Sequence, residues 1–181
     1  MDAQPAALGL VIRPARPDDL ESLLAIQREA AVTAFGHVFP QDRYPFPTDD
    51  IREVWRETLA DPDVEIYLAE AEGEPAGSVS VDGEFLRTLY VLPRHQGTGV
   101  GSALHDFALE RLAVRGCRTA RLWTLEENWD GRRFYERRGW TLTEETRAVP
   151  FPPSPIDVQY AKPLSAAPAD PLGRSDLHQR S

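Results

Sequence analysis

Three closely spaced glycines could form a binding site for an anionic group. Gly97, Gly99 and Gly101 lie in the stretch "VLPRHQGTGVGSAL", residues 91–104, between an apolar run and a segment with helical periodicity. Glycine adopts backbone angles that are closed to other residues, and it lets a ligand approach the main chain. The free amides and the dipole at the start of a helix favour a phosphate group. The stretch therefore predicts either a phosphate-binding turn or a turn that only redirects the chain.

Two common phosphate-binding motifs fit this stretch poorly. A P-loop needs Gly-Lys followed by Ser or Thr, whereas these glycines lead into Ser102 and Ala103 with no lysine. A dinucleotide fingerprint would have Ser102 in place of its third glycine, with Glu126 or Glu127 as the acidic group that binds the ribose. The preceding strands look like hairpins, whereas that fold needs parallel strands. Dinucleotide binding therefore remains only as an alternative.

A different reading frame gives a more specific match. The pattern Gln96-x-x-Gly99-x-Gly101 follows an extended segment and begins a helical one. It resembles motif A of the GCN5-related N-acetyltransferase (GNAT) family, whose pattern is Gln/Arg-x-x-Gly-x-Gly/Ala. An overlapping frame beginning at Arg94 also matches, but the start of the helical segment favours the frame at Gln96.

A second segment resembles the same family. The stretch "NWDGRRFYERRGW", residues 128–140, is similar to the family pattern Asn-x-x-Ala-x-x-x-Tyr-x-x-x-Gly-Phe, with Asn128, Tyr135 and Gly139 at matching positions. Gly131 replaces the usual alanine, and Trp140 replaces the usual phenylalanine. The resemblance covers residues 8 to 164.

The resemblance implies that acetyl-CoA is the co-substrate. Its pyrophosphate would lie on the amides of the glycine-rich turn. Its pantetheine arm would enter between the strands "LRTLYV" and "ARLWTL", where backbone groups of Leu89 and Val91 would bind the arm or the thioester oxygen. The expected cofactor-binding residues are Leu89, Tyr90, Val91, Gln96, Gly97, Thr98, Gly99, Val100, Gly101, Ser102, Asn128 and Tyr135.

The resemblance also suggests the groups that move protons. Tyr135 is the expected general acid, because a phenol is protonated at neutral pH and can return a proton to a leaving thiolate. Glu84 is the expected general base, with Glu126 and His37 as alternatives. Each residue also has a structural alternative: Tyr135 as a core tyrosine, Asn128 as a helix N-cap and Glu84 as a solvated hairpin residue.

Further side chains could contact the phosphates or the acceptor. Cys117 fits a buried inert thiol better than an acyl-carrying nucleophile. The candidates for phosphate contacts are Arg94, His95, Arg132 and Arg133. The candidates for the walls of an acceptor pocket are Phe35, Phe39, Tyr44, Phe46 and Phe151, and the carboxylates that could attract an amine are Asp42, Asp49 and Asp50.

Taken together, the sequence predicts an acetyl-CoA-dependent N-acetyltransferase that acts by direct attack of an amine in a ternary complex. The acceptor would be a primary amine on a small molecule or on a peptide or protein N-terminus. A non-catalytic acyl-CoA-binding module of the same fold is the alternative. The family resemblance also allows a homodimer.

The elements that must position these residues follow from periodicity and turn signals. They give an α+β fold in the order β-α-α-β-β-β-α-β-α-β-β, with a mixed, mostly antiparallel central sheet flanked by helices. Thr48 is the expected N-cap of the second helix, and Gly116 is expected to end the third. The expected strands are 8–15, 64–73, 75–83, 84–93, 117–127, 140–147 and 156–164, and the expected helices are 20–34, 49–60, 99–115 and 128–139.

Composition limits the remaining possibilities. The chain of 181 residues predicts one N-acetyltransferase domain over 8–164, with disordered termini at 1–7 and 165–181. A net charge of −9 argues against a nucleic-acid partner. No apolar run approaches the roughly 18 residues of a membrane span, and the first residues do not read as a secretory signal. One cysteine and four scattered histidines argue against a metal site, and the single cysteine fits a cytoplasmic location.

Overall fold

The central sheet has seven strands in the order β1-β2-β3-β4-β5-β7-β6. The computed structural model describes residues 9–165, so the predicted disordered termini lie outside the described residues apart from Ser165. The strands are β1 (Leu10–Pro14), β2 (Val64–Ala71), β3 (Glu74–Asp82), β4 (Phe85–Val91), β5 (Thr119–Leu125), β6 (Thr141–Ala148) and β7 (Ile156–Pro163). The helices are α1 (Leu20–Phe35), α2 (Thr48–Ala60), α3 (Val100–Val114) and α4 (Trp129–Glu136), with short 3-10 turns η1 (Pro17–Asp19) and η2 (Pro93–His95).

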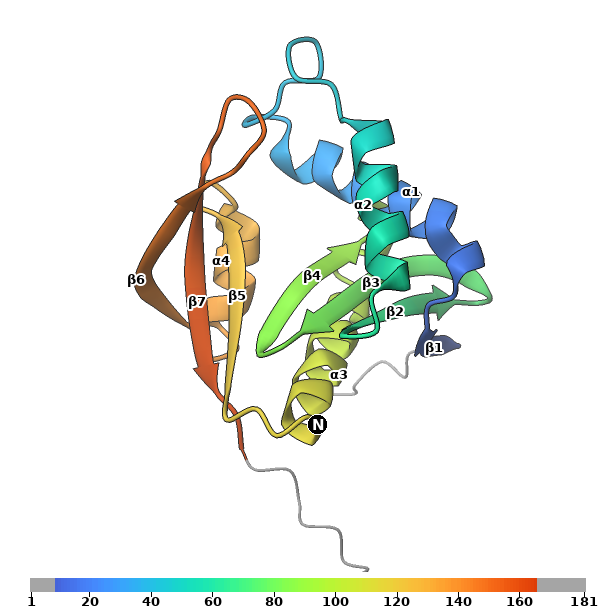
Figure 1. Ribbon diagram of the computed structural model, residues 1–181, viewed down its shortest axis with the longest axis vertical. Helices are drawn as coiled ribbons and strands as arrows, with labels where there is room; N and C mark the ends of the chain where they lie inside the picture. Colours follow the sequence, from blue (N-terminus) through green and yellow to red (C-terminus); the bar gives the residue numbers. More distant parts are fainter. Residues whose placement is uncertain (1–8, 166–181) are drawn as a thin grey trace, which may run out of the picture.

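The structure confirms the predicted α+β class and the predicted order of elements. Neighbouring strands are antiparallel except β4 and β5, which are parallel and register only at Phe85 and Arg121. Beyond this pair the two strands diverge, so β1–β4 and β5–β7 form two halves of one sheet (Figure 1). The divergence leaves one edge of each strand without a strand partner.

Helices cover both faces of the half-sheet β1–β4. On one face, Leu23 and Ile26 of α1 and Trp55 of α2 pack with Leu68 of β2 in one buried cluster. On the other face, Leu104 of α3 belongs to a larger cluster that also includes residues of β3, β5, β7 and α4. The strand periodicity of two sends alternate residues to the two clusters, which fixes the register of the sheet.

Two helix ends differ from expectation, and one is the end of α4, which stops at Glu136 and not at Gly139. Pro47, and not Thr48, is the N-cap of α2, because the Pro47 carbonyl accepts the first helical bond from the Ile51 amide at 3.0 Å. The prediction for Thr48 is therefore wrong by one residue. Gly116 does end α3 as predicted: its φ is +85°, and the Cys117 amide donates back to the Leu112 carbonyl at 3.1 Å.

Candidate active site

The turn between β4 and α3 depends on two of its three glycines for its shape. Gly97 has φ +74° and Gly99 has φ +96°, both in the left-handed region that favours glycine. Gly99 is the N-cap of α3, and the Thr98 hydroxyl closes the turn by donating to the His95 carbonyl at 2.6 Å. Gly101 has an ordinary helical backbone, and an added Cβ would meet Val91 Cγ2 at an unstrained 3.5 Å. Backbone geometry therefore explains Gly97 and Gly99 but not Gly101.

The amides of this turn have no partner within the described part of the chain. The first helical bond of α3 runs from the Ala103 amide to the Gly99 carbonyl at 3.0 Å. In residues 9–165, no backbone or side-chain acceptor binds the amides of residues 97–102. These donors stand at the positive end of a 15-residue helix. The turn thus presents free donors at a helix N-terminus, an arrangement that suits an anionic group.

The open edge of β4 continues from this turn. The Leu92 amide donates to the Ala76 carbonyl of β3 at 2.9 Å. Because hydrogen-bonded and non-hydrogen-bonded pairs alternate in an antiparallel ladder, Leu89 and Val91 direct their backbone polar groups away from β3 and toward β5. Among the described residues, their only partner on that side is the Gln96 side-chain amide, at 3.4 Å from the Val91 carbonyl. This edge can therefore pair with an extended ligand.

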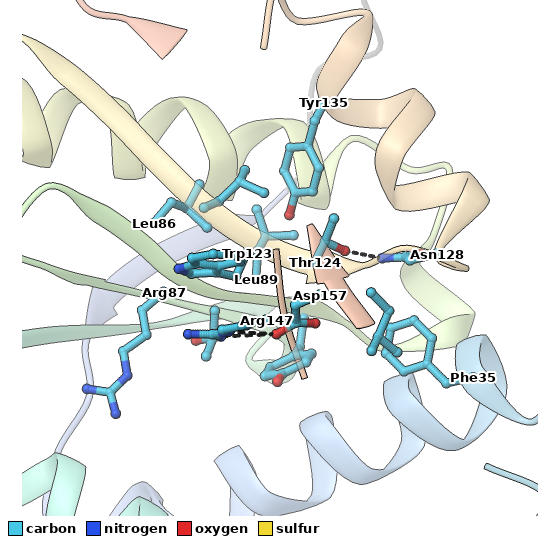
Figure 2. Close-up of a pocket in the computed structure, with 14 residues that line it drawn as sticks. Phe35, Leu86, Arg87, Leu89, Trp123, Thr124, Asn128, Tyr135, Arg147 and Asp157 are labelled. Atoms are coloured by element: carbon cyan, nitrogen blue, oxygen red, sulfur yellow. Dashed lines mark hydrogen bonds and ion pairs between the residues drawn. The ribbon is translucent and has the colours of Figure 1, made fainter. Parts of the chain in front are cut away.

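A cavity of about 230 Å³, here called the wedge, lies between the diverging strands (Figure 2). Its walls are residues 86–90 of β4 and 122–125 of β5, with Tyr135 and Asn128 at the α4 side. A second cavity of about 430 Å³ joins the wedge to the glycine-rich turn through Leu89, Tyr90 and Val91. A ligand can therefore run continuously from the free amides into the wedge.

Tyr135 extends from α4 toward the wedge, and its ring belongs to the buried core (Figure 2). The ring packs against Trp140 and Phe134 with centroid separations of 5.9 and 5.4 Å. Its hydroxyl makes no hydrogen bond to a described residue. Burial raises the pKa of Tyr135 far above its ordinary value, and the neighbouring Tyr90 adds to the shift. The phenol therefore stays protonated at neutral pH, as a proton donor requires.

Asn128 is the N-cap of α4, so that predicted structural alternative is confirmed. Its Oδ1 accepts from the Gly131 amide at 3.1 Å, and its Nδ2 donates to Thr124 Oγ1 at 2.9 Å (Figure 2). The side chain also lines both cavities, so the cap does not remove it from the ligand path. Asn128 thus caps α4 and also lines the candidate active site.

The same cap explains why glycine replaces alanine at position 131. A Cβ added to Gly131 would lie 2.7 Å from Asn128 Cγ and 2.9 Å from its Oδ1. These separations are shorter than real side chains tolerate, so an alanine would displace Asn128 from its cap. The departure from the family pattern therefore follows from how closely Asn128 folds over the helix start.

Glu84 lies at the narrow end of the wedge and not along its walls. Its carboxylate binds Arg121 Nε at 2.6 Å, and its carbonyl accepts from the Arg121 amide. His37 binds the Glu127 carbonyl through its Nε2 at 3.1 Å and lines none of the cavities described here. Glu126 lines none of them either. The structure does not bring any of the three predicted base candidates to Tyr135.

The predicted phosphate contacts are mostly engaged elsewhere. Arg132 donates to the Tyr160 hydroxyl and the Glu126 carbonyl, Arg133 pairs with Asp130, and Arg94 reaches the Pro75 carbonyl. Sequence reasoning missed Arg138, which donates to the Ser102 hydroxyl at the start of α3 and lies over the Phe134 ring at 3.6 Å. The turn after α4 therefore brings Arg138 to the start of α3, beside the free amides.

A third cavity, here called the aromatic cavity, measures about 500 Å³ and adjoins the wedge. All five predicted aromatic side chains line it, as does Asp50, whereas Asp42 and Asp49 do not. Tyr90 and Asp157 line both the aromatic cavity and the wedge, and sequence reasoning missed Asp157. Burial and the charge of Asp157 raise the pKa of Tyr90 to about 12. The aromatic cavity thus opens on the wedge from the α1 and α2 side.

Two kinds of feature are absent from residues 9–165. Within these residues, no helix is both long and apolar enough to cross a membrane. The same residues contain no group of three or more His, Cys, Asp or Glu side chains arranged to hold a metal ion.

A mixed sheet that splays between two parallel strands, beside a helix with free N-terminal amides, defines a class of acyl-CoA-dependent transferases. The sequence model described as "Acetyltransferase (GNAT) family" matches residues 25–140. This chain belongs to the GNAT acetyltransferase family, as the sequence resemblance implied.

Individual relatives agree with this assignment. An uncharacterized N-acetyltransferase of Archaeoglobus fulgidus is 27% identical over 135 residues, which cover 68% of this chain and 88% of that protein. The mycothiol acetyltransferase of Cellulomonas flavigena is 31% identical over 157 residues, or 78% of this chain and only 41% of that protein. The PaiA N-acetyltransferase of Thermoplasma acidophilum, solved in complex with coenzyme A, has the same fold with a TM-score of 0.67 at 18% identity, covering 86% of this chain and 99% of that one.

Proposed function

We propose that the protein transfers an acetyl group from acetyl-CoA to a primary amine by direct attack in a ternary complex. One observation carries the proposal: the free amides of residues 97–102 lead along an unpaired strand edge to the protonated hydroxyl of Tyr135. The coenzyme A bound to a solved protein of the same fold supports the choice of cofactor.

The chain's own residues fit this cofactor. The amides at the start of α3 would hold its pyrophosphate, and Gly101 leaves room beside them where no backbone strain requires a glycine. Leu89 and Val91 would pair with the pantetheine amides through the backbone groups that face away from β3, and would direct an N–H group at the thioester oxygen. When bound, acetyl-CoA supplies the thioester carbonyl that the amine attacks.

Tyr135 and Glu84 would move the protons in this reaction. As the new C–N bond forms and the C–S bond breaks, Tyr135 would donate its hydroxyl proton to the leaving sulfur. Glu84 remains the predicted general base, and from the narrow end of the wedge it would act through water, since Arg121 holds its carboxylate. A Glu84→Gln variant with an unchanged pH profile of kcat/KM would remove Glu84 from the reaction.

The proposal is tested by measuring release of the coenzyme A thiol with a panel of small amines and peptides. Acetyl-CoA binding is followed separately by calorimetry. Amine-dependent thiol release, matched by acetylated product, is the expected result. Tight acetyl-CoA binding without turnover on any amine would instead identify a non-catalytic acyl-CoA-binding module.

A further inference from the structure

Asp157 occupies a distinctive position between the two cavities. It lies on β7, where its neighbours in register are Leu125 of β5 and Arg147 of β6. Of the acidic residues in 9–165, Asp157 is the only one that lines the wedge, and it also lines the aromatic cavity. A group bound to Asp157 would therefore lie where the aromatic cavity meets the wedge.

One oxygen of this carboxylate is held and the other is available. Arg147 donates to Asp157 Oδ2 from Nε at 3.1 Å and from Nη2 at 3.0 Å (Figure 2). No described residue donates to Oδ1, although only 13% of the side chain is exposed. Arg147, which also lines the wedge, is itself held over the Trp123 ring at 4.4 Å, so it fixes the carboxylate through Oδ2. A fixed and mostly buried carboxylate binds a donor more strongly than a solvated one does.

The rest of the aromatic cavity favours an apolar molecule. Phe35 and Phe46 come from the α1–α2 region, and Val149 and Phe151 come from the β6–β7 loop. Aromatic and aliphatic walls bury the body of a ligand, while few polar groups orient it. The lining also includes Asp50, which is exposed and does not reach the wedge.

We infer that Asp157 binds the amino group of the acceptor through Oδ1, and that the aromatic cavity selects monoamines with an apolar body, such as arylalkylamines. This inference rests on the proposed function and adds the acceptor class and a specificity-determining residue to it. The amine nitrogen would lie at the mouth of the wedge, across from Tyr135. Tyr90, which stays protonated in this setting, would border the same nitrogen.

The test compares 2-phenylethylamine with methylamine in the wild-type protein and in three variants. Methylamine keeps the amino group but cannot fill the cavity. Asp157→Asn keeps the size of the side chain and removes its charge. Asp42→Asn removes the same charge from an exposed loop position outside the cavity, and Arg147→Gln removes the ion pair while keeping the carboxylate.

In the wild type, 2-phenylethylamine should give a kcat/KM at least about tenfold above that of methylamine. Asp157→Asn should lower kcat/KM for 2-phenylethylamine by about tenfold or more, with the KM for acetyl-CoA unchanged. Asp42→Asn should match the wild type, and Arg147→Gln, which frees the carboxylate but keeps it, should lose clearly less than Asp157→Asn does. A comparable loss in Asp157→Asn and Arg147→Gln would show that only the ion pair matters, which overturns the inference.

Two further outcomes separate the inference from the proposed function. Wild-type turnover with no effect of Asp157→Asn overturns the role of Asp157 and leaves the transferase intact. If no amine releases thiol, the proposed function fails, and binding of 2-phenylethylamine to the coenzyme A complex is then measured by calorimetry. Binding that Asp157→Asn abolishes would support the amine site, and absence of binding would overturn it.

Discussion

Tyr135 and Tyr160 contact each other in the core, yet they use their hydroxyl groups differently. The Tyr160 hydroxyl accepts from Arg132 at 2.9 Å and donates to Glu136 at 2.6 Å, whereas the Tyr135 hydroxyl faces the wedge with no partner among the described residues. A hydroxyl that no structural bond requires is available for chemistry. The two side chains therefore form a matched pair for separating catalysis from folding.

Tyr135→Phe should lower kcat by about a hundredfold, since it removes the proposed proton donor, and should leave acetyl-CoA affinity unchanged. Thermal unfolding should change little, because no protein hydrogen bond is lost. Tyr160→Phe should behave in the opposite way: it should lower the free energy of unfolding by about 1 kcal/mol and keep kcat. Weaker acetyl-CoA binding with normal kcat in Tyr135→Phe would make Tyr135 a packing residue.

The glycines at 99 and 101 allow a similar separation. Gly99→Ala should destabilise the protein by about 1 kcal/mol, because φ at this position is +96°. Gly101→Ala should stabilise the protein by about 0.5–1 kcal/mol, because alanine suits a helix and the added Cβ meets only ordinary contacts. It should nevertheless weaken acetyl-CoA binding if the phosphates need that space.

Chemical denaturation measures the free energy of unfolding of both alanine variants, and calorimetry measures their affinity for acetyl-CoA. Gly101→Asp adds charge repulsion and should weaken binding further than Gly101→Ala does. Unchanged affinity in Gly99→Asp and Gly101→Asp together would remove the phosphate site from the glycine-rich turn.

At the scale of elements, α4 is a helix of eight residues whose start depends on one side chain. Gly131→Ala should displace Asn128 from its cap, which would lower the free energy of unfolding by about 1 kcal/mol despite the higher helix propensity of alanine. The loss should disappear in the background of Asn128→Ala, because no cap is left there to displace. Additive losses in the double variant, measured by urea denaturation, would contradict this explanation.

The sequence predicted the elements well because each carries a local signal. Helix α2 repeats its buried residues at Ile51, Trp55 and Thr58, and α3 begins directly after the glycines. Asp157 carries no such signal, since an isolated aspartate near the start of a late strand is common. Its position depends on the pairing of β7 with both β5 and β6, which only the folded sheet specifies. The ion pair of Glu84 was equally hidden from local patterns, because its partner Arg121 lies 37 residues along the chain.

At the scale of the whole molecule, the buried His105 of α3 forms a hydrogen bond with Trp140, which lies between α4 and β6. The indole N–H of Trp140 donates to His105 Nε2 at 2.9 Å, so the imidazole proton belongs on Nδ1, which lies 2.8 Å from Asp106 Oδ1. Burial lowers the pKa of His105; Arg138 and Lys162 lower it further, and Asp106 opposes the shift. The folded protein therefore holds His105 neutral.

This arrangement predicts how stability depends on pH. Because the folded-state pKa of His105 lies below its unfolded value of about 6.5, the unfolded chain takes up the proton first as the pH falls. The stabilising contribution is fully present above about pH 6.5 and is lost progressively below it. The melting temperature should fall between pH 7.5 and 5.5 more steeply in the wild type than in His105→Gln. Equal slopes would show that other groups dominate this range.

The single registered pair between β4 and β5 has a consequence for the protein without substrate. Among the described residues, Phe85 and Arg121 are the only registered pair across this seam, and the bonds between Glu84 and Arg121 lie at the same end, so the strand edges beyond them are open to a third backbone. A bound pantetheine chain would lie between the two strand edges as an additional strand and hold the two half-sheets together. Substrate loading would then stiffen the scaffold as well as prepare the reaction, and the amides along the seam would exchange with deuterium more slowly once it is filled.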